Sequence, residues 1–250
     1  MNGSAAGPPE ALRRFYTIAS TAPEPGGTAR VLLDGRPVRT PARALLAVPP
    51  RIAEAIAAEW NAQGERILPL TMPLTRLANT AIDGVREASA AVRDDVAAIA
   101  SNDLVLYRAD APAGLVAAQQ ALWDDVVAYG EGAFGVRLAL AEGVMPVQQD
   151  ERLAARVAAA LPGDALALAA MHQLATLTGS ALLALMVRDG SISFDDAWAA
   201  AHVDEDWNIR EWGEDEEATR RRAQRERDAK AAAFILRPEM DHPMPASMAG

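Results

Sequence analysis

Carboxylates are the most abundant side chains in this sequence that could act as acids, bases or metal ligands. Many are adjacent along the chain, among them the aspartate pairs Asp94-Asp95, Asp124-Asp125 and Asp195-Asp196. Neighbouring residues on a helix point in different directions, so the two acids of a pair do not converge on one ion or one reacting atom. The pairs are interpreted as solvated helix faces, and no catalytic residues are assigned.

The three histidines are the other candidates for a general base or a metal ligand: His172, His202 and His242. No two have the spacing of a metal site, and no Gly-x-Ser-x-Gly segment supports a serine hydrolase. His172 lies in an apolar stretch, where we expect a buried histidine with a satisfied hydrogen bond. His202 falls at an expected helix junction. No metal-binding residues are assigned.

Nucleotide chemistry also lacks the residues that it needs. Gly130, Gly132 and Gly135 have the spacing of the dinucleotide fingerprint, but they follow a predicted helix instead of a strand, so a loop is expected there. A phosphate-binding loop requires a well-placed lysine, and Lys230, in a highly charged segment, is the only lysine. The chain has no cysteine, which excludes thiol chemistry. No cofactor is expected.

Tryptophans and acids gather near the C-terminal end of the chain. Trp198, Trp207 and Trp212 surround the acids at 204–206 and Glu211. Aromatic anchors beside acids are typical of protein-binding surfaces with a polar rim. The same tryptophans could instead fill the core of a helical bundle, and both interpretations stay open.

The one basic cluster, residues 220–225, directly follows the acids of residues 214–217. Glu216 and Arg220 are four residues apart, as are Glu217 and Arg221, so each pair can meet on one helix face. Acids before bases also suit the helix dipole. The cluster is predicted to be a self-neutralised exposed helix and not an RNA site.

The charge of the 250-residue chain disfavours nucleic acids and anionic membranes as partners, because 34 acids and 24 bases give a net charge of −10. Residues 165–187 are apolar enough to consider a membrane span, but His172 and Thr176 interrupt them and no aromatic belt flanks them. We expect a helix buried in a bundle, with no stable membrane insertion. Residues 1–13 lack the apolar run of a secretory signal and are expected to be a disordered leader.

The N-terminal region has the composition of short strands. These are predicted over residues 14–18, 30–33, 36–40 and 45–48. The turn residues at 23–27 separate the first and second strands. Asp34-Gly35 is a strong hairpin signal between the second and third strands. A helix is predicted from Pro49-Pro50 until Gly64.

The rest of the chain has helical patterns. They are predicted over residues 74–100, 114–130, 149–161, 165–188 and 204–234, with a break near Gly84, a cap at Asp164 and a further short helix that begins at Ser193. Strands followed by helices indicate the α+β class: a small N-terminal α/β domain with a mostly antiparallel sheet, then an all-helical orthogonal bundle. We expect a leader at 1–13, domains at 14–85 and 86–236, and a flexible tail at 237–250.

Several of these segments together resemble one family. They are residues 14–16, 31–41, 57–63, 72–83, 101–109, 143–146, 176–180 and 212–213. In this order they are similar to the assembly chaperones of the catalytic F1 sector of ATP synthase, specifically the family that attends the F1 alpha subunit. The chain has Trp207-Asn208 where family members often carry an aromatic–Gln pair.

The resemblance implies a two-domain chaperone without cofactor or catalytic activity. Its partner would be the unassembled F1 alpha subunit, whose beta-facing surface it shields until the F1 complex forms. The arginine-rich composition and the lack of a transit peptide favour a bacterial, cytoplasmic member that is monomeric when free.

Two sets of residues follow from the resemblance and the patterns together. The partner-binding set is Glu216, Glu205, Trp207, Trp212 and Asp215. On a continuous helix Glu205 lies close to three turns before Glu216, so both can lie on one face. The structural set is Trp60, which we expect to pack on the sheet, together with Arg76, Asn79 and Asp83 at the domain junction. The alternative function is that of an enzyme with an unrecognised carboxylate-based active site.

The absent phosphate loop generates a first prediction. We expect no ATP hydrolysis and no tight ATP binding by the isolated protein, because no lysine or helix-opening glycine loop can hold the phosphates. Isothermal titration calorimetry with ATP should give no heat of binding; a dissociation constant on the order of micromolar would contradict the prediction.

Overall fold

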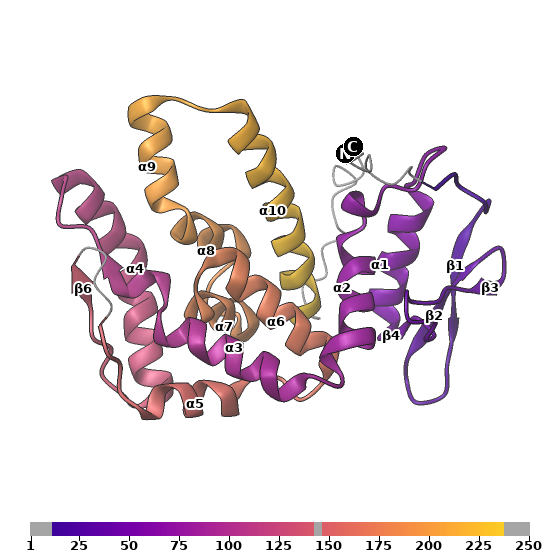
Figure 1. Cartoon of the computed structure of the whole chain (residues 1–250), viewed down its shortest axis with the longest axis horizontal. Helices are drawn as coiled ribbons and strands as arrows, with labels where there is room; N and C mark the ends of the chain where they lie inside the picture. Colours follow the sequence, from indigo (N-terminus) through magenta and orange to yellow (C-terminus); the bar gives the residue numbers. More distant parts are fainter. Residues whose placement is uncertain (1–11, 143–146, 238–250) are drawn as a thin grey trace, which may run out of the picture. The chain divides into compact units, whose positions relative to one another are not determined.

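A computed structural model describes residues 12–142 and 147–237 (Figure 1). An antiparallel sheet followed by helices confirms the predicted α+β class. Contacts among the described residues separate two compact units, which divide between Arg76 and Leu77. The expected division after residue 85 stays a prediction. The expected leader and tail lie outside the described residues, except Leu12, Arg13 and Arg237.

The first unit is built on a four-stranded antiparallel sheet. Its strands are β1 (Ala19–Pro23), β2 (Ala29–Leu33), β3 (Arg36–Pro37) and β4 (Ala47–Val48). β2 pairs with β1 along its whole length and with β3 and β4 at its other edge. Asp34 and Gly35, between β2 and β3, have φ values of 47° and 80°, the left-handed region that a two-residue hairpin requires. The predicted hairpin is confirmed.

The strand predicted at residues 14–18 is wrong, because β1 begins only at Ala19. The backbone N–H groups of Thr17 and Ile18 donate to the Asp34 carboxylate at 2.9–3.1 Å instead of to a neighbouring strand. The Arg14 N–H donates to the carbonyl oxygen of Glu65. Asp34 thus accepts the hydrogen bonds from Thr17 and Ile18 that would otherwise pair a longer β1 with a neighbouring strand.

Helix α1 (Pro50–Asn61) covers the sheet and begins at the predicted prolines. Proline is favourable there because the first N–H of a helix has no partner inside it. Ile52 and Ile56 are at most 4% exposed. At the other end of α1 the Trp60 ring meets Tyr16 edge-on, with 5.5 Å between the ring centroids, and the Tyr16 hydroxyl donates to the Trp60 carbonyl oxygen at 2.6 Å. A structural role for Trp60 stays a prediction.

The Glu59 carboxylate joins α1 to the start of α2 (Pro73–Thr80), which follows a short 3-10 helix, η1 (Pro69–Thr71). It accepts the Leu74 N–H at 2.7 Å, and the N–H and hydroxyl of Thr75 at 2.8 and 2.7 Å. These two N–H groups belong to the first turn of α2, where no carbonyl inside the helix can pair with them. A side chain of α1 therefore caps α2.

The helix expected at residues 74–100 is interrupted, as the break predicted near Gly84 requires. After α2, a π-helical turn, η2 (Ala81–Val85), precedes α3 (Ser89–Ser101). The chain then forms a 3-10 turn, η3 (Leu104–Leu106), and enters the remaining helices.

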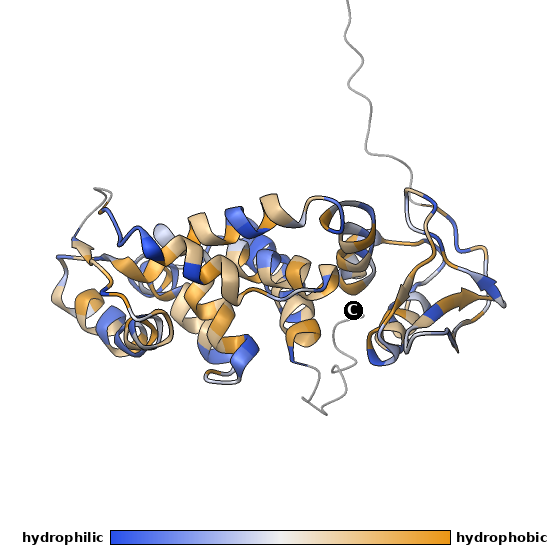
Figure 2. Ribbon diagram, turned by 90° about the horizontal axis from the view of Figure 1, so that it is seen from below, coloured by the Kyte–Doolittle hydropathy of each residue, from blue (hydrophilic) through white to orange (hydrophobic). Residues whose placement is uncertain are grey.

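The second unit packs its helices around α6 (Ala165–Thr178) and α7 (Ala181–Asp189), which contact each other along with α3 and α10. The other helices are α4 (Ala113–Phe134), α5 (Arg152–Ala160), α8 (Phe194–Ala201), α9 (Val203–Trp212) and α10 (Glu216–Leu236), and a short parallel pair is formed by β5 (Tyr107–Arg108) and β6 (Ala141–Glu142). Figure 2 shows apolar residues concentrated inside the helical part and hydrophilic ones mainly at its periphery. Within the described residues, no helix combines the length and apolarity needed to cross a membrane.

The single apolar helix expected at residues 165–188 is wrong. The structure divides it at Gly179, whose φ of 69° ends α6, and the Ser180 hydroxyl caps α7 by accepting the Leu183 N–H at 3.0 Å. The predicted cap at Asp164 is confirmed, since its carboxylate accepts the Ala167 N–H at 2.8 Å.

The glycines of the dinucleotide-like spacing do not form the expected loop. Gly130 and Gly132 lie inside α4, and Gly135, with a φ of 56°, ends that helix. A Cβ on Gly130 would come within 3.1 Å of the Leu138 and Leu182 side chains. This glycine therefore allows close packing against its neighbours and has no place in a nucleotide site.

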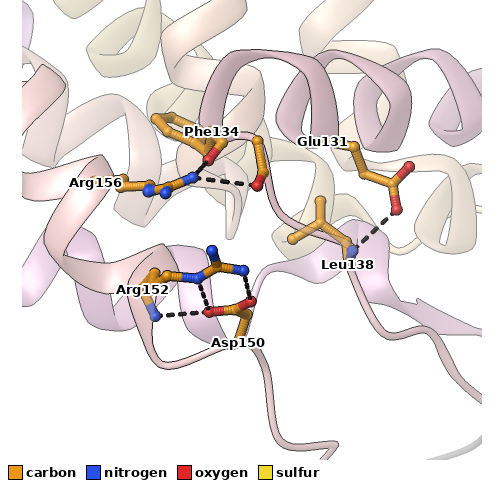
Figure 3. A network of polar contacts seen from close by, with 7 residues as sticks. Glu131, Phe134, Leu138, Asp150, Arg152 and Arg156 are labelled. Carbon is orange, nitrogen blue, oxygen red and sulfur yellow. Dashed lines mark hydrogen bonds and ion pairs between the residues drawn. The ribbon is translucent and has the colours of Figure 1, made fainter.

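Polar contacts fix the end of α4 and the segment that follows it (Figure 3). Arg156 of α5 donates to the carbonyl oxygens of Phe134 and Gly135, which have no partners inside α4. The Glu131 carboxylate accepts the Leu138 N–H at 3.0 Å. Residues 143–146, part of the resemblance, lie outside the described residues.

The half-buried Glu59 carboxylate leads to a prediction about pH. Burial raises its pKa to about 7, although the hydrogen bonds from Thr75 and Leu74 lower it. Because the pKa is raised on folding, the contribution of Glu59 to the free energy of unfolding is fully present below about pH 4.5 and is lost as the pH rises through about 7.

We expect the wild type to lose about 1–3 kcal/mol of stability relative to Glu59→Gln across that pH window, since glutamine resembles the protonated acid and does not titrate. Urea denaturation of both proteins at several pH values measures the difference. A difference that stays constant between pH 4.5 and 7 would contradict the prediction.

Candidate functional site

The C-terminal helices carry the residues that the sequence predicts to bind a partner. The one long helix expected at residues 204–234 is wrong, because α9 ends at Trp212 and α10 begins at Glu216. Gly213 has a φ of 91°, and the Asp215 carboxylate caps α10 by accepting the Ala218 N–H at 2.7 Å. Figure 1 shows α9 and α10 as two helices joined by a short loop. The placement of Glu205 and Glu216 on one continuous helix face is therefore wrong.

A groove of about 750 Å³ lies between the two helices, and we call it the hairpin groove. α9 contributes Ile209 and Trp212 to its lining, and α10 contributes Ala218 and Ala223. Trp212 is 87% exposed, by far the most exposed large apolar side chain among the described residues. A tryptophan left this open gains almost nothing from folding, since burial is what makes an aromatic side chain stabilising.

Acidic side chains surround the apolar lining. They are Glu205, Asp206, Glu214, Asp215 and Glu226. Arg222 lines the groove too, but it forms an ion pair with Asp206, which raises the pKa of the arginine. Glu226 is also paired, with Lys230 at 2.7 Å. Two of the five acids are thus neutralised, and the groove keeps a negative charge around an apolar centre.

The floor of the hairpin groove reaches the core of the second unit. Trp198 of α8 lines the groove and is only 6% exposed. Its carbonyl oxygen lies 2.8 Å from Nδ1 of His202, and the centroids of the Trp198 and His202 rings are 3.9 Å apart. Burial lowers the pKa of His202, which favours the neutral imidazole. His202 is therefore suited to a packing role at the junction of α8 and α9.

Trp207 does not line the hairpin groove; it lies on the side of α9 that faces α4. A Cβ on Gly114 of α4 would overlap the Trp207 ring, so the glycine allows the ring to lie against the helix backbone. The guanidinium of Arg210 covers the ring, 4.4 Å from its centroid. Trp207 thus fixes α9 on α4.

Glu216 and Glu217 open α10 outside the lining of the hairpin groove. The carboxylate of Glu216 is 94% exposed and lies 4.0 Å from Arg220, at the limit of an ion pair. Glu217 pairs with Arg221 at 2.6 Å. Two neighbouring glutamates on one helix end therefore differ in how firmly they are engaged.

Of the five predicted partner-binding residues, Glu205, Trp212 and Asp215 line the hairpin groove. Glu216 lies beside the loop, and Trp207 lies on the opposite face of α9. The sequence does not predict Ile209 and Asp206 as groove residues, because they line a common space with α10 only after the chain reverses direction at Gly213.

The residues predicted for the domain junction lie close to the division between the units. Arg76 is the last residue of the first unit, inside α2, and Asn79 and Asp83 follow in the second. The Oδ1 atom of Asn79 is buried and has no hydrogen-bond partner among the described residues. The junction role of these residues stays a prediction.

Among the other candidates for chemistry, the structure brings His172 close to Asp95. The side chain of His172 is 37% exposed and lies 3.8 Å from Asp95, so the expectation of a core histidine is wrong. Although α6 is apolar nearly all round, His172 lies on a part of this helix that reaches the protein surface. Within residues 12–142 and 147–237 no group of three acidic or histidine side chains could hold a metal ion.

Comparison with known proteins identifies the family. The model of a family described as ATP12 chaperone protein matches residues 13–131. The crystal structure of a candidate chaperone from Agrobacterium tumefaciens is 44% identical over 90% of this chain and 85% of that chain, with a TM-score of 0.84. The crystal structure of Atp12 from Paracoccus denitrificans is 38% identical over 90% of this chain and 97% of that chain, with a TM-score of 0.81.

The matches extend over both units, and the predicted resemblance is confirmed. The alternative of an unrecognised enzyme is wrong, because the family consists of non-enzymatic assembly factors. The chain therefore belongs to the ATP12 family of ATP synthase F1 assembly chaperones.

Proposed function

We propose that the chain binds the unassembled F1 alpha subunit and shields its beta-facing surface until the F1 complex forms. Membership of the ATP12 family supports this proposal. The observation that carries the choice of surface is the hairpin groove, where the exposed Trp212 stands among acids. Such a surface, apolar at its centre and charged at its rim, fits a protein partner.

A physical argument explains why no catalytic group is needed. A subunit awaiting assembly exposes the apolar surface that a neighbour will cover, and exposed apolar surface promotes aggregation. A protein that covers this surface one-to-one needs contact area, anchors and complementary charge. The hairpin groove offers an anchor in Trp212 and negative charge in Glu205 and Asp215.

We assign the leading polar contact to Glu216, with Glu205 next. The Glu216 carboxylate is exposed and only loosely engaged by Arg220, so an arginine of the alpha subunit could replace that partner with little cost. Trp207 supports the surface indirectly by holding α9 on α4.

We propose that the chaperone acts in the bacterial cytoplasm as a monomer. The bacterial sources of the similar structures support this setting. The net charge of −10 supports a protein partner over nucleic acid.

The two glutamates at the start of α10 provide a matched test. We expect Glu216→Gln to stay folded, within about 0.5 kcal/mol of the wild type, because an exposed ion pair contributes little. It should nevertheless lose protection of the alpha subunit, measured by light scattering during aggregation of alpha. Glu217→Gln, whose glutamate already pairs with Arg221, should protect normally. Equal protection by the two variants would reject the assignment.

The two tryptophans of α9 provide a second test. Trp212→Ala should leave the free energy of unfolding within about 0.5 kcal/mol of the wild type, because a side chain that is 87% exposed makes few contacts. Trp207→Ala should cost about 2–4 kcal/mol, because it leaves a cavity over Gly114. Chemical denaturation measures both, and co-purification with alpha should fail for Trp212→Ala. Retained binding by this variant would remove Trp212 from the interface.

A further inference from the structure

A second groove, of about 490 Å³, lies in the first unit, where the chain before β1 meets β3 and the end of α1. Its apolar lining is largely aromatic, and we call it the aromatic groove. Phe15, Tyr16, Pro37, Val38 and Trp60 contribute to this lining. All belong to the first unit, so the groove exists without any contribution from the helices of the second.

The aromatic groove combines a fixed floor with an open wall. Tyr16 and Val38 are each 7% exposed, and Tyr16 is held by the Trp60 carbonyl oxygen. Phe15, in edge-on contact with Tyr16, is 65% exposed. The Nε1 atom of Trp60 is buried and has no acceptor among the described residues. In the unbound protein, the indole N–H without an acceptor costs free energy, and Phe15 exposes apolar surface to water. A ligand that covers Phe15 and accepts this hydrogen bond would remove both costs.

Arginines form the rim of the aromatic groove. Arg36 and Arg39 line it and are exposed, and neither has a carboxylate within ion-pair distance among the described residues. Arg39 donates only to the carbonyl oxygen of Arg43, at 2.8 Å. The acid at the same rim, Asp34, is already occupied by the N–H groups of Thr17 and Ile18. Two cations are thus available to a ligand.

The charge of the whole first unit agrees with this local picture. Residues 12–76 contain nine arginines and five acids, a formal charge of +4. Residues 77–237 contain 15 basic and 26 acidic residues, a formal charge of −11. A strongly acidic protein therefore has one basic unit, which attracts a different partner surface from the one that the acidic hairpin groove attracts.

We propose that the aromatic groove binds a short acidic peptide segment of a partner protein. One apolar side chain of the segment lies against Phe15 and Trp60, and flanking carboxylates pair with Arg36 and Arg39. Arginine suits this role because its planar guanidinium binds a carboxylate through two parallel hydrogen bonds. The site is separate from the hairpin groove and does not depend on the function proposed for it.

The dimensions of the aromatic groove favour a peptide over a single-stranded nucleic acid, which also uses aromatic and basic side chains. A nucleic-acid groove needs cations along several successive phosphates. Here only Arg36 and Arg39 are available, three residues apart, with the ionised Asp34 beside them; hydrogen bonds from Ile18 and Thr17 hold the pKa of Asp34 below its ordinary value. The volume suits one or two side chains.

The test is a titration of the isotope-labelled full-length protein with the blocked peptide acetyl-Glu-Asp-Leu-Glu-Asp-amide, followed by nuclear magnetic resonance. The proposal predicts that the indole N–H signal of Trp60 shifts. The affinity should fall at least about fivefold when the salt concentration rises from about 0.05 to about 0.3 M. Peptides with glutamine and asparagine in place of the acids, or glycine in place of leucine, should bind at least about fivefold more weakly.

The matched variants are Arg36→Gln combined with Arg39→Gln, and Arg43→Gln, which removes an exposed arginine outside the groove. The double variant should lose at least about fivefold in affinity, and Arg43→Gln should bind like the wild type. Equal binding by all three proteins, or no shift at Trp60, would overturn the proposal. It would also be overturned if a thymidine oligonucleotide shifted Trp60 at a lower concentration than the peptide does.

Discussion

One buried carboxylate, that of Asp103, connects the parts of the second unit on which the hairpin groove depends. It is 0% exposed. It accepts the N–H of Val105 at 3.3 Å and the N–H of Leu182, which lies 79 residues further along the chain, at 3.0 Å. Burial raises the pKa of Asp103 to about 6, although hydrogen bonds from Ser180 and the backbone lower it. Each N–H left without this acceptor would cost about 1–3 kcal/mol. Asp103 therefore fixes the first turn of α7, the most deeply buried helix of the unit, and α7 in turn packs on α4 and α8.

From this core the support extends outward to the exposed hairpin. The indole N–H of Trp123 in α4 donates to the carbonyl oxygen of Ala200 at 2.7 Å, which fixes α8, and Gln119 of the same helix donates to Asp204 at the start of α9. Trp207 then lies against α4, so α9 is held along one side while Trp212, beyond it, stays open. The bundle thus provides a rigid base for α9 and leaves the last turn of this helix exposed. That arrangement suits the function proposed here, in which the exposed turn contacts the alpha subunit.

The sequence predicts those features that local chemistry decides. The Asp34-Gly35 hairpin, the helix start at Pro50 and the caps at Asp164 and Ser193 follow from rules about single turns, and the structure confirms them. Two of the errors occur at glycines: Gly179 and Gly213 each end a helix within a continuous apolar or charged pattern, because a glycine with positive φ outweighs helical periodicity. The hairpin groove could not be predicted, since it exists only once α10 folds back beside α9. The aromatic groove could not be predicted from the sequence either, because Phe15, Arg36 and Trp60 meet only in the folded first unit.

We propose that the alpha subunit docks on the hairpin groove. Hydrogen–deuterium exchange of the chaperone, alone and with unassembled F1 alpha subunit, measures this directly for every segment of the chain. We expect slower exchange in the complex at residues 205–219, which include Trp212 and the cap of α10, with little change in α5 on the same unit. Protection confined to other segments, with residues 205–219 exchanging as fast in the complex as in the free protein, would contradict it.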